Sequence, residues 1–222
     1  MKTRLFALCA LALVSLSGCI SVKVYVDPSM AKTGYEDLRK PAEPLALKVN
    51  VEFLRNGKRV ANAENELRGD VERILRATGV IVPSASAENG EISVTVNNVG
   101  DLGSAAGKGF ATGMTFGLVG TSVQDGYEMS VTLTIHGSSV TKSGYKDVLI
   151  STVGNKKAPE GLTPTSPSAG FATVVEQMLL NALSDLQKDG YLASLETLLD
   201  RLLISISSAN DLSQSPANIT SS

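Results

Sequence analysis

Apolar and polar residues alternate along several stretches of the chain, and each such stretch predicts a β-strand with one buried face. The clearest is 45–53, in which leucine, valine and phenylalanine occupy every second position and polar residues lie between them. A period of two places successive side chains on opposite faces of a strand. The same pattern runs through 91–99 and 127–137, and 145–153 is a further strand candidate. The shorter alternation at 22–26 is equally compatible with a strand and with part of an N-terminal tether.

The apolar period lengthens to that of an α-helix in three places. From Asn62 onwards, apolar residues recur at intervals of three and four up to Gly79, which ends the pattern. This apolar stripe consists of Leu67, Val71, Ile74 and Leu75. A second helix is predicted to begin near Ser168 and to stop or kink at Gly190. The leucine-rich stretch 191–206 also has helical spacing, and it either folds back onto the core or offers a stripe to a partner.

The order of these elements is strand, helix, strand, strand, strand, helix and helix, which predicts the α+β class. Strands that alternate cleanly have one face in solvent, so we expect the helices to cover the other face. The prediction is a two-layer sandwich, with a mainly antiparallel sheet of about four strands and the helices on one face. The predicted domain spans 45–206, with a glycine-rich insertion at 102–124 and a disordered tail at 207–222.

The N-terminus has the layout of a secretory signal. Two basic residues, Lys2 and Arg4, precede an uncharged apolar run. The run is too short and wrongly flanked for a stable transmembrane helix. It ends in Leu16-Ser17-Gly18-Cys19, which resembles the lipobox of bacterial lipoproteins at all four positions. The predicted organisation is therefore a signal peptide at 1–18 and a lipidated tether at 19–44.

The lipobox resemblance implies that Cys19 becomes the mature N-terminus and carries a diacylglyceryl thioether and an amide-linked acyl chain. Two or more acyl chains anchor a protein stably, whereas one chain gives only marginal membrane binding. In that family an Asp directly after the lipidated cysteine retains the protein in the inner membrane, whereas Ile20 and Ser21 follow Cys19 here. The resemblance therefore implies anchoring in the outer membrane of a Gram-negative cell, facing the periplasm. The order of strands and helices also resembles, in layout only, small periplasmic domains of outer-membrane assembly lipoproteins.

Composition argues against several classes of function. Loss of Lys2 and Arg4 with the signal leaves 18 basic and 22 acidic residues, a net charge of −4 that argues against nucleic-acid binding. Cys9 leaves with the signal and Cys19 is consumed by lipid, so the mature domain has no disulfide and no free thiol. His136 is the single histidine and is predicted to lie among threonines on the polar face of its strand. We therefore expect no metal site, no cofactor and no enzymatic activity.

Residues 102–124 form a glycine-rich segment between two predicted strands. Gly109, Gly113 and Gly117 recur every four residues, which would place them on one side of a helix. In lipid such faces of small residues let helices approach closely, but in water each glycine costs about 1 kcal/mol relative to alanine. Two interpretations stay open. The segment is either a flexible crossover between strands or a glycine zipper at 103–120 that inserts into the membrane, lies on it or self-associates.

Together these features favour a non-enzymatic binding or envelope-assembly factor, held to the membrane by the lipid on Cys19 and bound to another envelope protein. The alternative is a homo-oligomeric, membrane-inserting component that uses the glycine-zipper segment 103–120. Aromatic residues make up only 5% of the chain and tryptophan is absent, which disfavours a ligand site built on stacked rings.

Overall fold

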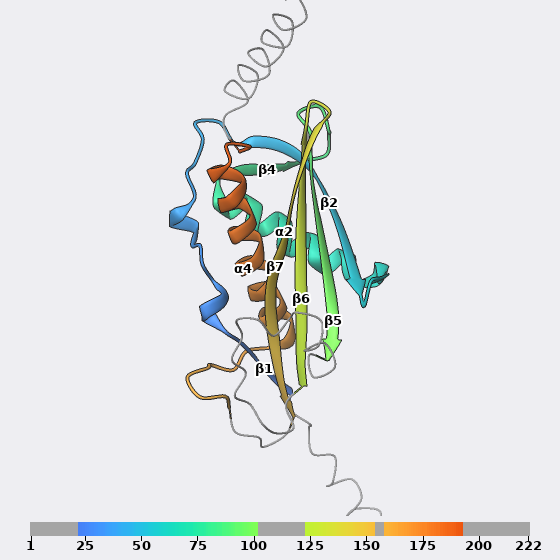
Figure 1. Ribbon diagram of the computed structural model, residues 1–222, viewed down its shortest axis with the longest axis vertical. Helices are drawn as coiled ribbons and strands as arrows, with labels where there is room; N and C mark the ends of the chain where they lie inside the picture. The colour runs from blue at the N-terminus through green and yellow to red at the C-terminus, as the bar shows by residue number, and fades with distance from the viewer. Residues whose placement is uncertain (1–21, 102–122, 154–157, 193–222) are drawn as a thin grey trace, which may run out of the picture.

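The computed structural model describes residues 22–101, 123–153 and 158–192. They form an α+β architecture in which one mixed sheet of seven strands packs against two α-helices (Figure 1). The predicted class is confirmed. The sheet is larger than the expected four or so strands, so that part of the prediction is wrong. It is mainly antiparallel as predicted, with four antiparallel pairings among the described strands, but the pairings of β2 with β4 and with β5 are parallel.

β2, β5 and β6 fall close to where the alternation of apolar residues predicts them, whereas β7 begins at Ser138, before its predicted start at 145. The strands are β1 (Val22–Val26), β2 (Leu45–Arg55), β3 (Lys58–Arg59), β4 (Ile81–Ser84), β5 (Glu91–Asp101), β6 (Val123–Ile135) and β7 (Ser138–Val153). The α-helices are α2 (Glu64–Thr78) and α4 (Pro167–Lys188), and the chain also makes the short 3-10 turns η1 (Pro28–Met30), η2 (Tyr35–Asp37) and η3 (Ala61–Ala63).

The sheet has the strand order β1-β7-β6-β5-β2-β3, and β4 pairs with β2 off this path. The long strands β5, β6 and β7 form an antiparallel meander. β2 runs parallel to β5 and to β4, and helix α2 forms the crossover that parallel pairing of β2 with β4 requires. The sequence pattern does not predict β4, because its four residues are too few for alternation to stand out and they include Pro83.

Helix α2 confirms the first predicted helix. Its apolar stripe is fully buried against β2, β4 and α4. Gly79 ends the helix in the left-handed conformation, with φ of 68°, which glycine adopts without steric cost. The outward side stays charged, and Arg76 Nη2 lies 2.9 Å from Glu72 Oε2 one turn away.

Helix α4 confirms the second predicted helix and is buried around most of its circumference. It begins after Ser166, whose Oγ accepts a hydrogen bond of 3.2 Å from Ala169 N. Its first turn lies close to the sheet at Gly170, where a Cβ atom would come within 2.7 Å of Val24 and 2.8 Å of Leu149. The stretches 193–206 and 207–222, predicted as a helix and a tail, lie outside the described residues.

The chain from 22 to 44 belongs to the domain, which corrects the tether predicted at 19–44 for its described part. Val22–Val26 is strand β1, paired with β7 at one edge of the sheet. Residues 27–44, which we call the strap, then run alongside α4 (Figure 1) and bury Leu38. The folded domain therefore already includes β1, and does not begin with β2 as predicted.

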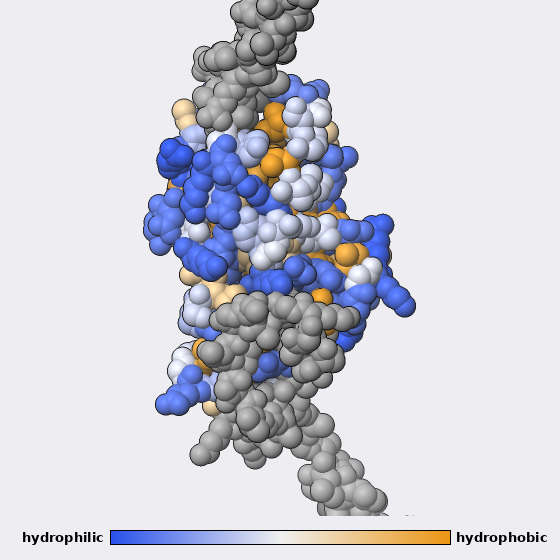
Figure 2. All heavy atoms as spheres, viewed as in Figure 1, coloured by the Kyte–Doolittle hydropathy of each residue, from blue (hydrophilic) through white to orange (hydrophobic). Residues whose placement is uncertain are grey.

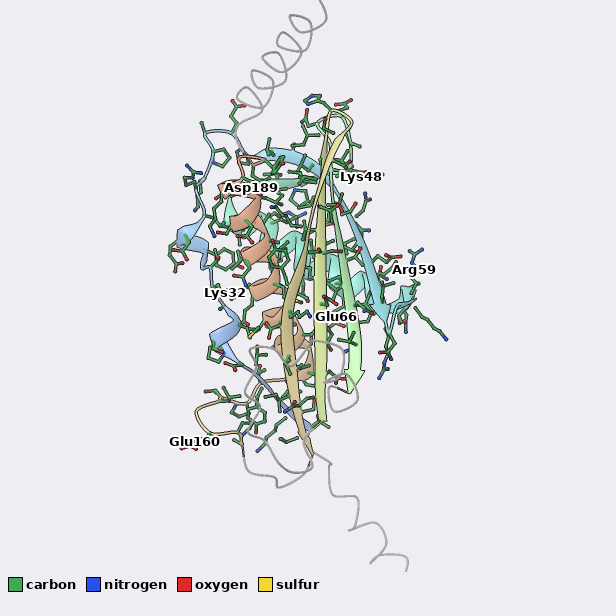
Figure 3. All side chains as sticks on the ribbon, in the orientation of Figure 1. Lys32, Lys48, Arg59, Glu66, Glu160 and Asp189 are labelled. Carbon is green, nitrogen blue, oxygen red and sulfur yellow. The ribbon has the colours of Figure 1, made fainter. Side chains whose placement is uncertain are left out.

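Two amide side chains of α4 hold the strap by its backbone. Asn181 Oδ1 accepts a hydrogen bond from Lys32 N at 3.2 Å, and Asn181 Nδ2 donates to Met30 O at 3.2 Å. Gln187 Oε1 accepts from Arg39 N at 3.0 Å, and Gln187 Nε2 donates to Arg39 O at 2.6 Å. Lys32 is seen beside α4 in Figure 3. Each amide thus satisfies both a donor and an acceptor of the strap, and neither contact is visible in a local sequence pattern.

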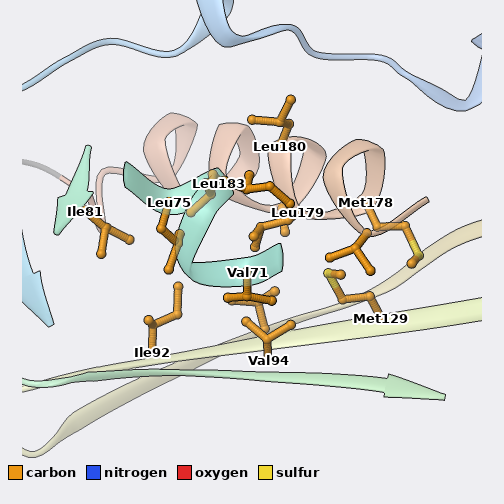
Figure 4. Packing of buried hydrophobic residues seen from close by; sticks show 14 of the residues in the cluster. Val71, Leu75, Ile81, Ile92, Val94, Met129, Met178, Leu179, Leu180 and Leu183 are labelled. Atoms are coloured by element: carbon orange, nitrogen blue, oxygen red, sulfur yellow. The ribbon is translucent and has the colours of Figure 1, made fainter. Parts of the chain in front are cut away.

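The main core lies between the two helices and one side of the sheet, which we call the covered face. Figure 4 shows Val71 and Leu75 of α2 and Leu179 of α4 packed above Ile92 and Val94 of the sheet. These side chains are all fully or almost fully buried. Burial of aliphatic side chains at this density is the main source of stability in a domain without disulfides.

Candidate functional site

The site residues predicted from the sequence lie outside the described residues. They are Cys19, Gly109, Gly113 and Gly117. The strands that flank the glycine-rich insertion are described, and β5 and β6 remain paired as far as Asp101, which lies opposite Asp125. The insertion therefore connects two neighbouring antiparallel strands, and it leaves and re-enters the sheet at the same end.

His136 lies in a turn and not on the polar face of a strand, which corrects its predicted position. β6 ends at Ile135 and β7 begins at Ser138, so His136 and Gly137 form a two-residue turn with φ of 48° and 80°. Positive φ at both central positions is the turn type that matches the twist of a β-hairpin. His136 is exposed at this tip, as expected for a surface histidine.

The side of the sheet opposite the helices, which we call the open face, carries polar side chains along β5, β6 and β7. The alternation that places Leu133 in the core places its neighbours Thr132 and Thr134 on this face. The hydroxyl residues at its centre form what we call the hydroxyl patch. They are Ser93, Thr95, Ser130, Thr132, Thr134, Ser139, Thr141 and Ser143. All of them are half-buried or exposed, because the described helices pack on the other side.

The hydroxyl groups of the patch pair across strands. Thr132 Oγ1 lies 2.8 Å from Thr141 Oγ1, and Thr134 Oγ1 lies 2.8 Å from Ser139 Oγ. A pair of this kind contributes about 0.2–1 kcal/mol to the sheet. Each hydroxyl has one donor and two acceptor positions, so capacity for further hydrogen bonds remains. The patch is therefore a surface that can hydrogen-bond a partner without having to desolvate charges.

Charged side chains lie at the margins of the hydroxyl patch. Asn50 Nδ2 donates a hydrogen bond of 3.0 Å to Glu91 Oε2 on the β2 side. On the other side, Lys146 Nζ lies 3.8 Å from Glu128 Oε1 across β6 and β7. The open face thus has a neutral polar centre and a charged rim, and it shares with protein–protein contacts the scarcity of charge at the centre.

The open face becomes apolar toward the end of the sheet where β1 begins. Tyr25, Val148 and Ile150 form a second, smaller buried cluster there, with Leu162 packed at its edge. The loop that carries Leu162 is fixed to β1, because Val24 exchanges backbone hydrogen bonds of 3.2 and 2.8 Å with Thr165. The side chains at this end of the open face are buried and cannot contact a partner. Binding through the open face would therefore use the hydroxyl patch.

Asp147 is a buried carboxyl group in β7, on the covered face. Its Oδ1 accepts a hydrogen bond of 2.6 Å from Val148 N, and its Oδ2 has no hydrogen-bond partner among the described residues. The pKa of Asp147 is raised to about 8, mainly by burial. The hydrogen bond from Val148 N opposes this increase, and the charge of Asp27 adds to it. The sequence pattern could have indicated that Asp147 is buried. Asp147 is two residues from the apolar Leu149, so both side chains lie on the same face of the strand.

A second cluster of polar groups joins the strap to both helices. Tyr35 OH donates a hydrogen bond of 2.8 Å to Glu176 Oε2 of α4, and Arg73 Nη1 of α2 lies 3.6 Å from the same carboxylate oxygen. Burial raises the pKa of Tyr35 to about 12, and the hydrogen bond and charge of Glu176 add to the increase. All three groups are paired with each other, so this cluster has a structural role in holding the strap.

Metal-binding clusters and helices that could span a bilayer are both absent from the described residues. Within 22–101, 123–153 and 158–192, no group of three His, Cys, Asp or Glu side chains could hold a metal ion. In the same ranges no helix is both long and apolar enough to cross a bilayer. Figure 2 shows a mostly polar surface in this view, with apolar side chains in small separate areas. Among the described surfaces, the open face is the candidate functional site because it carries the hydroxyl patch.

Neither a scan against protein-family models nor a search of curated proteins finds a match to this chain.

Proposed function

We propose that this protein is an outer-membrane-anchored periplasmic lipoprotein that acts without catalysis, by binding an envelope protein through the hydroxyl patch. The lipobox at Leu16-Ser17-Gly18-Cys19 supports the anchoring. The observation that carries the binding role is the open face itself. It is a sheet surface without a described helix over it, neutral at its centre and charged at its rim.

A photo-crosslinking experiment in intact cells tests the binding role. A photoreactive amino acid is placed at Thr141, which is exposed on the open face, and at Arg76, which is exposed on α2 on the opposite side. We expect a specific covalent adduct with one envelope protein from position 141 and none from position 76. Equal adducts from both positions, or none from 141 in crosslinked envelopes, would contradict the proposed surface.

The anchoring has its own test. Cells that express the wild-type chain in the presence of radiolabelled palmitate should incorporate the label, and the Cys19→Ser variant should not. Membrane fractionation should place the labelled protein with the outer membrane. A wild-type protein that takes up no lipid would remove the lipoprotein proposal, whatever the result at the open face.

A second candidate function is a homo-oligomeric, membrane-inserting component that uses 103–120. The length of the connection between β5 and β6 favours it. Two residues are enough to connect β6 to β7. The facing ends of β5 and β6 are also paired, but residues 102–122 connect them. Connections of that length are uncommon in compact domains and are usually functional or disordered. A secreted Cys19→Ser protein that stays monomeric and never binds liposomes would contradict this candidate.

A further inference from the structure

Strand β1 begins only three positions after Cys19. Three residues span at most about 11 Å when fully extended. The longest strand, β7, has 16 residues, which corresponds to about 50 Å at 3.3 Å per residue. A lipid group on Cys19 would therefore hold one end of a long sheet close to the bilayer, because only residues 20 and 21 separate Cys19 from β1.

The strand register shows what else lies at this end, which we call the anchor end. Val22 of β1 pairs with Val153 of β7, and Val123 of β6 pairs with Ser151. The last residues of β5 pair beside the start of β6 at the same end. The anchor end thus gathers the start of β1, the end of β7 and both attachment points of the glycine-rich insertion. The β6–β7 turn lies at the opposite end of the molecule (Figure 1).

The start of β1 is also held firmly to the domain. Its five residues pair in register with β7, and Val24 makes two more backbone hydrogen bonds on its other side, to Thr165. Val24 and Tyr25 are each 1% exposed and belong to the two apolar clusters on opposite faces of the sheet. Peeling β1 away to lengthen the connection would expose both side chains, so the folded domain keeps the short connection.

Neither face of the sheet offers a competing surface for the membrane in the described part of the chain. The open face carries the hydroxyl patch, and the outward side of α2 carries ion pairs such as Arg73 with Asp70 at 3.1 Å. Exposed large apolar side chains occur singly, at Val22, Val82 and Tyr191. Isolated side chains of this kind do not make a membrane-binding patch. The short anchor is therefore the feature that decides the orientation.

We propose that the anchor end is a membrane-contact surface, on which the domain stands with the long strands directed away from the bilayer. The partner is the lipid bilayer. This inference rests on the proposed lipidation of Cys19 and adds an orientation to it. A flexible tether at 19–44 would have allowed every orientation, whereas the observed fold permits a narrow range. The attachment points of the glycine-rich insertion lie at the bilayer, and the hydroxyl patch faces sideways into the periplasm.

Depth-dependent fluorescence quenching tests the orientation. The mature chain has no cysteine other than Cys19, so a single introduced cysteine gives a unique site for an environment-sensitive dye. Glu160 lies near the anchor end and Lys48 at the opposite end (Figure 3), and both side chains are exposed. The lipidated Glu160→Cys and Lys48→Cys proteins are purified from membranes, labelled, and reconstituted into phosphatidylethanolamine–phosphatidylglycerol vesicles that contain brominated lipid.

We expect quenching at position 160 to be at least threefold stronger than at position 48. Equal quenching at the two positions, or stronger quenching at 48, overturns the proposed orientation. Lipid incorporation is measured on the same preparations by mass spectrometry of the N-terminal peptide. A chain without lipid would contradict the proposed function, whereas a lipidated chain with equal quenching contradicts the orientation alone.

A linker variant provides the matched control. Sixteen Gly and Ser residues inserted between Ser21 and Val22 leave the described fold intact and add a reach of about 22 Å, from 5–6 Å times the square root of the residue number. In this background we expect quenching at position 160 to fall toward that at position 48. Unchanged strong quenching at 160 would mean that the anchor end binds lipid by its own surface, and the short connection would lose its role in the argument.

Discussion

The two faces of the sheet are built from the same strands and differ in what they contribute. On the covered face, Leu133 and Val131 of β6 are buried under helices. On the open face, Thr132 and Thr134 of the same strand remain accessible and pair with hydroxyl groups of β7. The strand backbone is common to both, so the difference lies in the side chains and in what covers them.

This comparison separates stability from recognition. Aliphatic side chains on the covered face lose contact with water, and each contributes about 1.5–3 kcal/mol when fully buried. Hydroxyl groups on the open face exchange hydrogen bonds with water for hydrogen bonds with each other, and the net contribution is small. Changes on the covered face should therefore affect folding, whereas changes on the open face should affect the proposed binding and leave folding nearly intact.

The largest expected effect is the loss of a core side chain from the covered face. Leu133 is 2% exposed, so Leu133→Ala should lower the free energy of unfolding by about 2–5 kcal/mol through lost burial and the cavity left behind. Urea denaturation followed by circular dichroism measures the change. A loss below 1 kcal/mol would mean that the covered face is not packed as described.

The next largest effect tests a buried carboxyl group on the covered face, that of Asp147. Its pKa is raised to about 8 in the folded state against 3.8 for the ordinary group, so the folded state binds more protons than the unfolded state between these values. The contribution of Asp147 to stability is therefore fully present below pH 3.8 and is lost as the pH rises toward 8. The slope has an upper limit of about 1.4 kcal/mol per pH unit. Since water penetration limits such penalties, we expect a loss of about 2 kcal/mol between pH 5 and 8.

The Asp147→Asn variant should remove this slope and unfold at higher urea concentration than the wild type at pH 8. The isosteric change Glu160→Gln, at an exposed position, serves as the control and should leave the slope unchanged. A wild-type protein whose stability is flat or rises over this pH range would contradict the burial of an unpartnered carboxyl group at Asp147.

A smaller effect is expected from the strap, which lies on the covered side beyond α4. Gln187→Ala removes two hydrogen bonds to the backbone of Arg39, so that the N–H and C=O groups of Arg39 must hydrogen-bond to water instead. We expect a loss of about 1–2 kcal/mol. Hydrogen exchange should become faster in the strap before it does in the sheet. The neighbouring Lys188→Ala removes only an exposed ion pair with Asp185, and it should cost no more than about 0.5 kcal/mol and leave exchange in the strap unchanged. Identical behaviour of the two variants would argue against the hydrogen bonds from Gln187 to the strap.

The smallest effect is expected on the open face. Thr132→Ala removes one hydroxyl of the pair with Thr141 and should cost about 0.2–1 kcal/mol. Measured beside Leu133→Ala, it compares two neighbouring residues that point to opposite faces. A loss as large as that of Leu133→Ala would mean that the open face is covered in the folded protein, and the hydroxyl patch would then not be free to bind a partner.

Much of the fold could be predicted because the controlling signal is local. Alternation identifies β2, β5 and β6, and the apolar stripe from Leu67 to Leu75 identifies α2, since each pattern reports which side of an element faces the core. The candidate site could be predicted only in part. The polar faces of the strands were visible, but the pairing of Thr132 with Thr141 depends on the register of β6 with β7, and that register includes a bulge next to Ser130.

By itself, the sequence determined the α+β class, the approximate bounds of β2, β5, α2 and α4, and the resemblance of residues 16–19 to a lipobox. Periodicity and short motifs are properties of neighbouring residues. The tertiary structure decided that residues 22–44 are a strand and a strap and not a tether, that β2 lies parallel to β5, and that Asp147 is buried. Those outcomes depend on contacts such as that between Asn181 and Met30, which are 151 residues apart. Contacts between residues so far apart form only when the elements pack together, and no local pattern of apolar and polar residues encodes them.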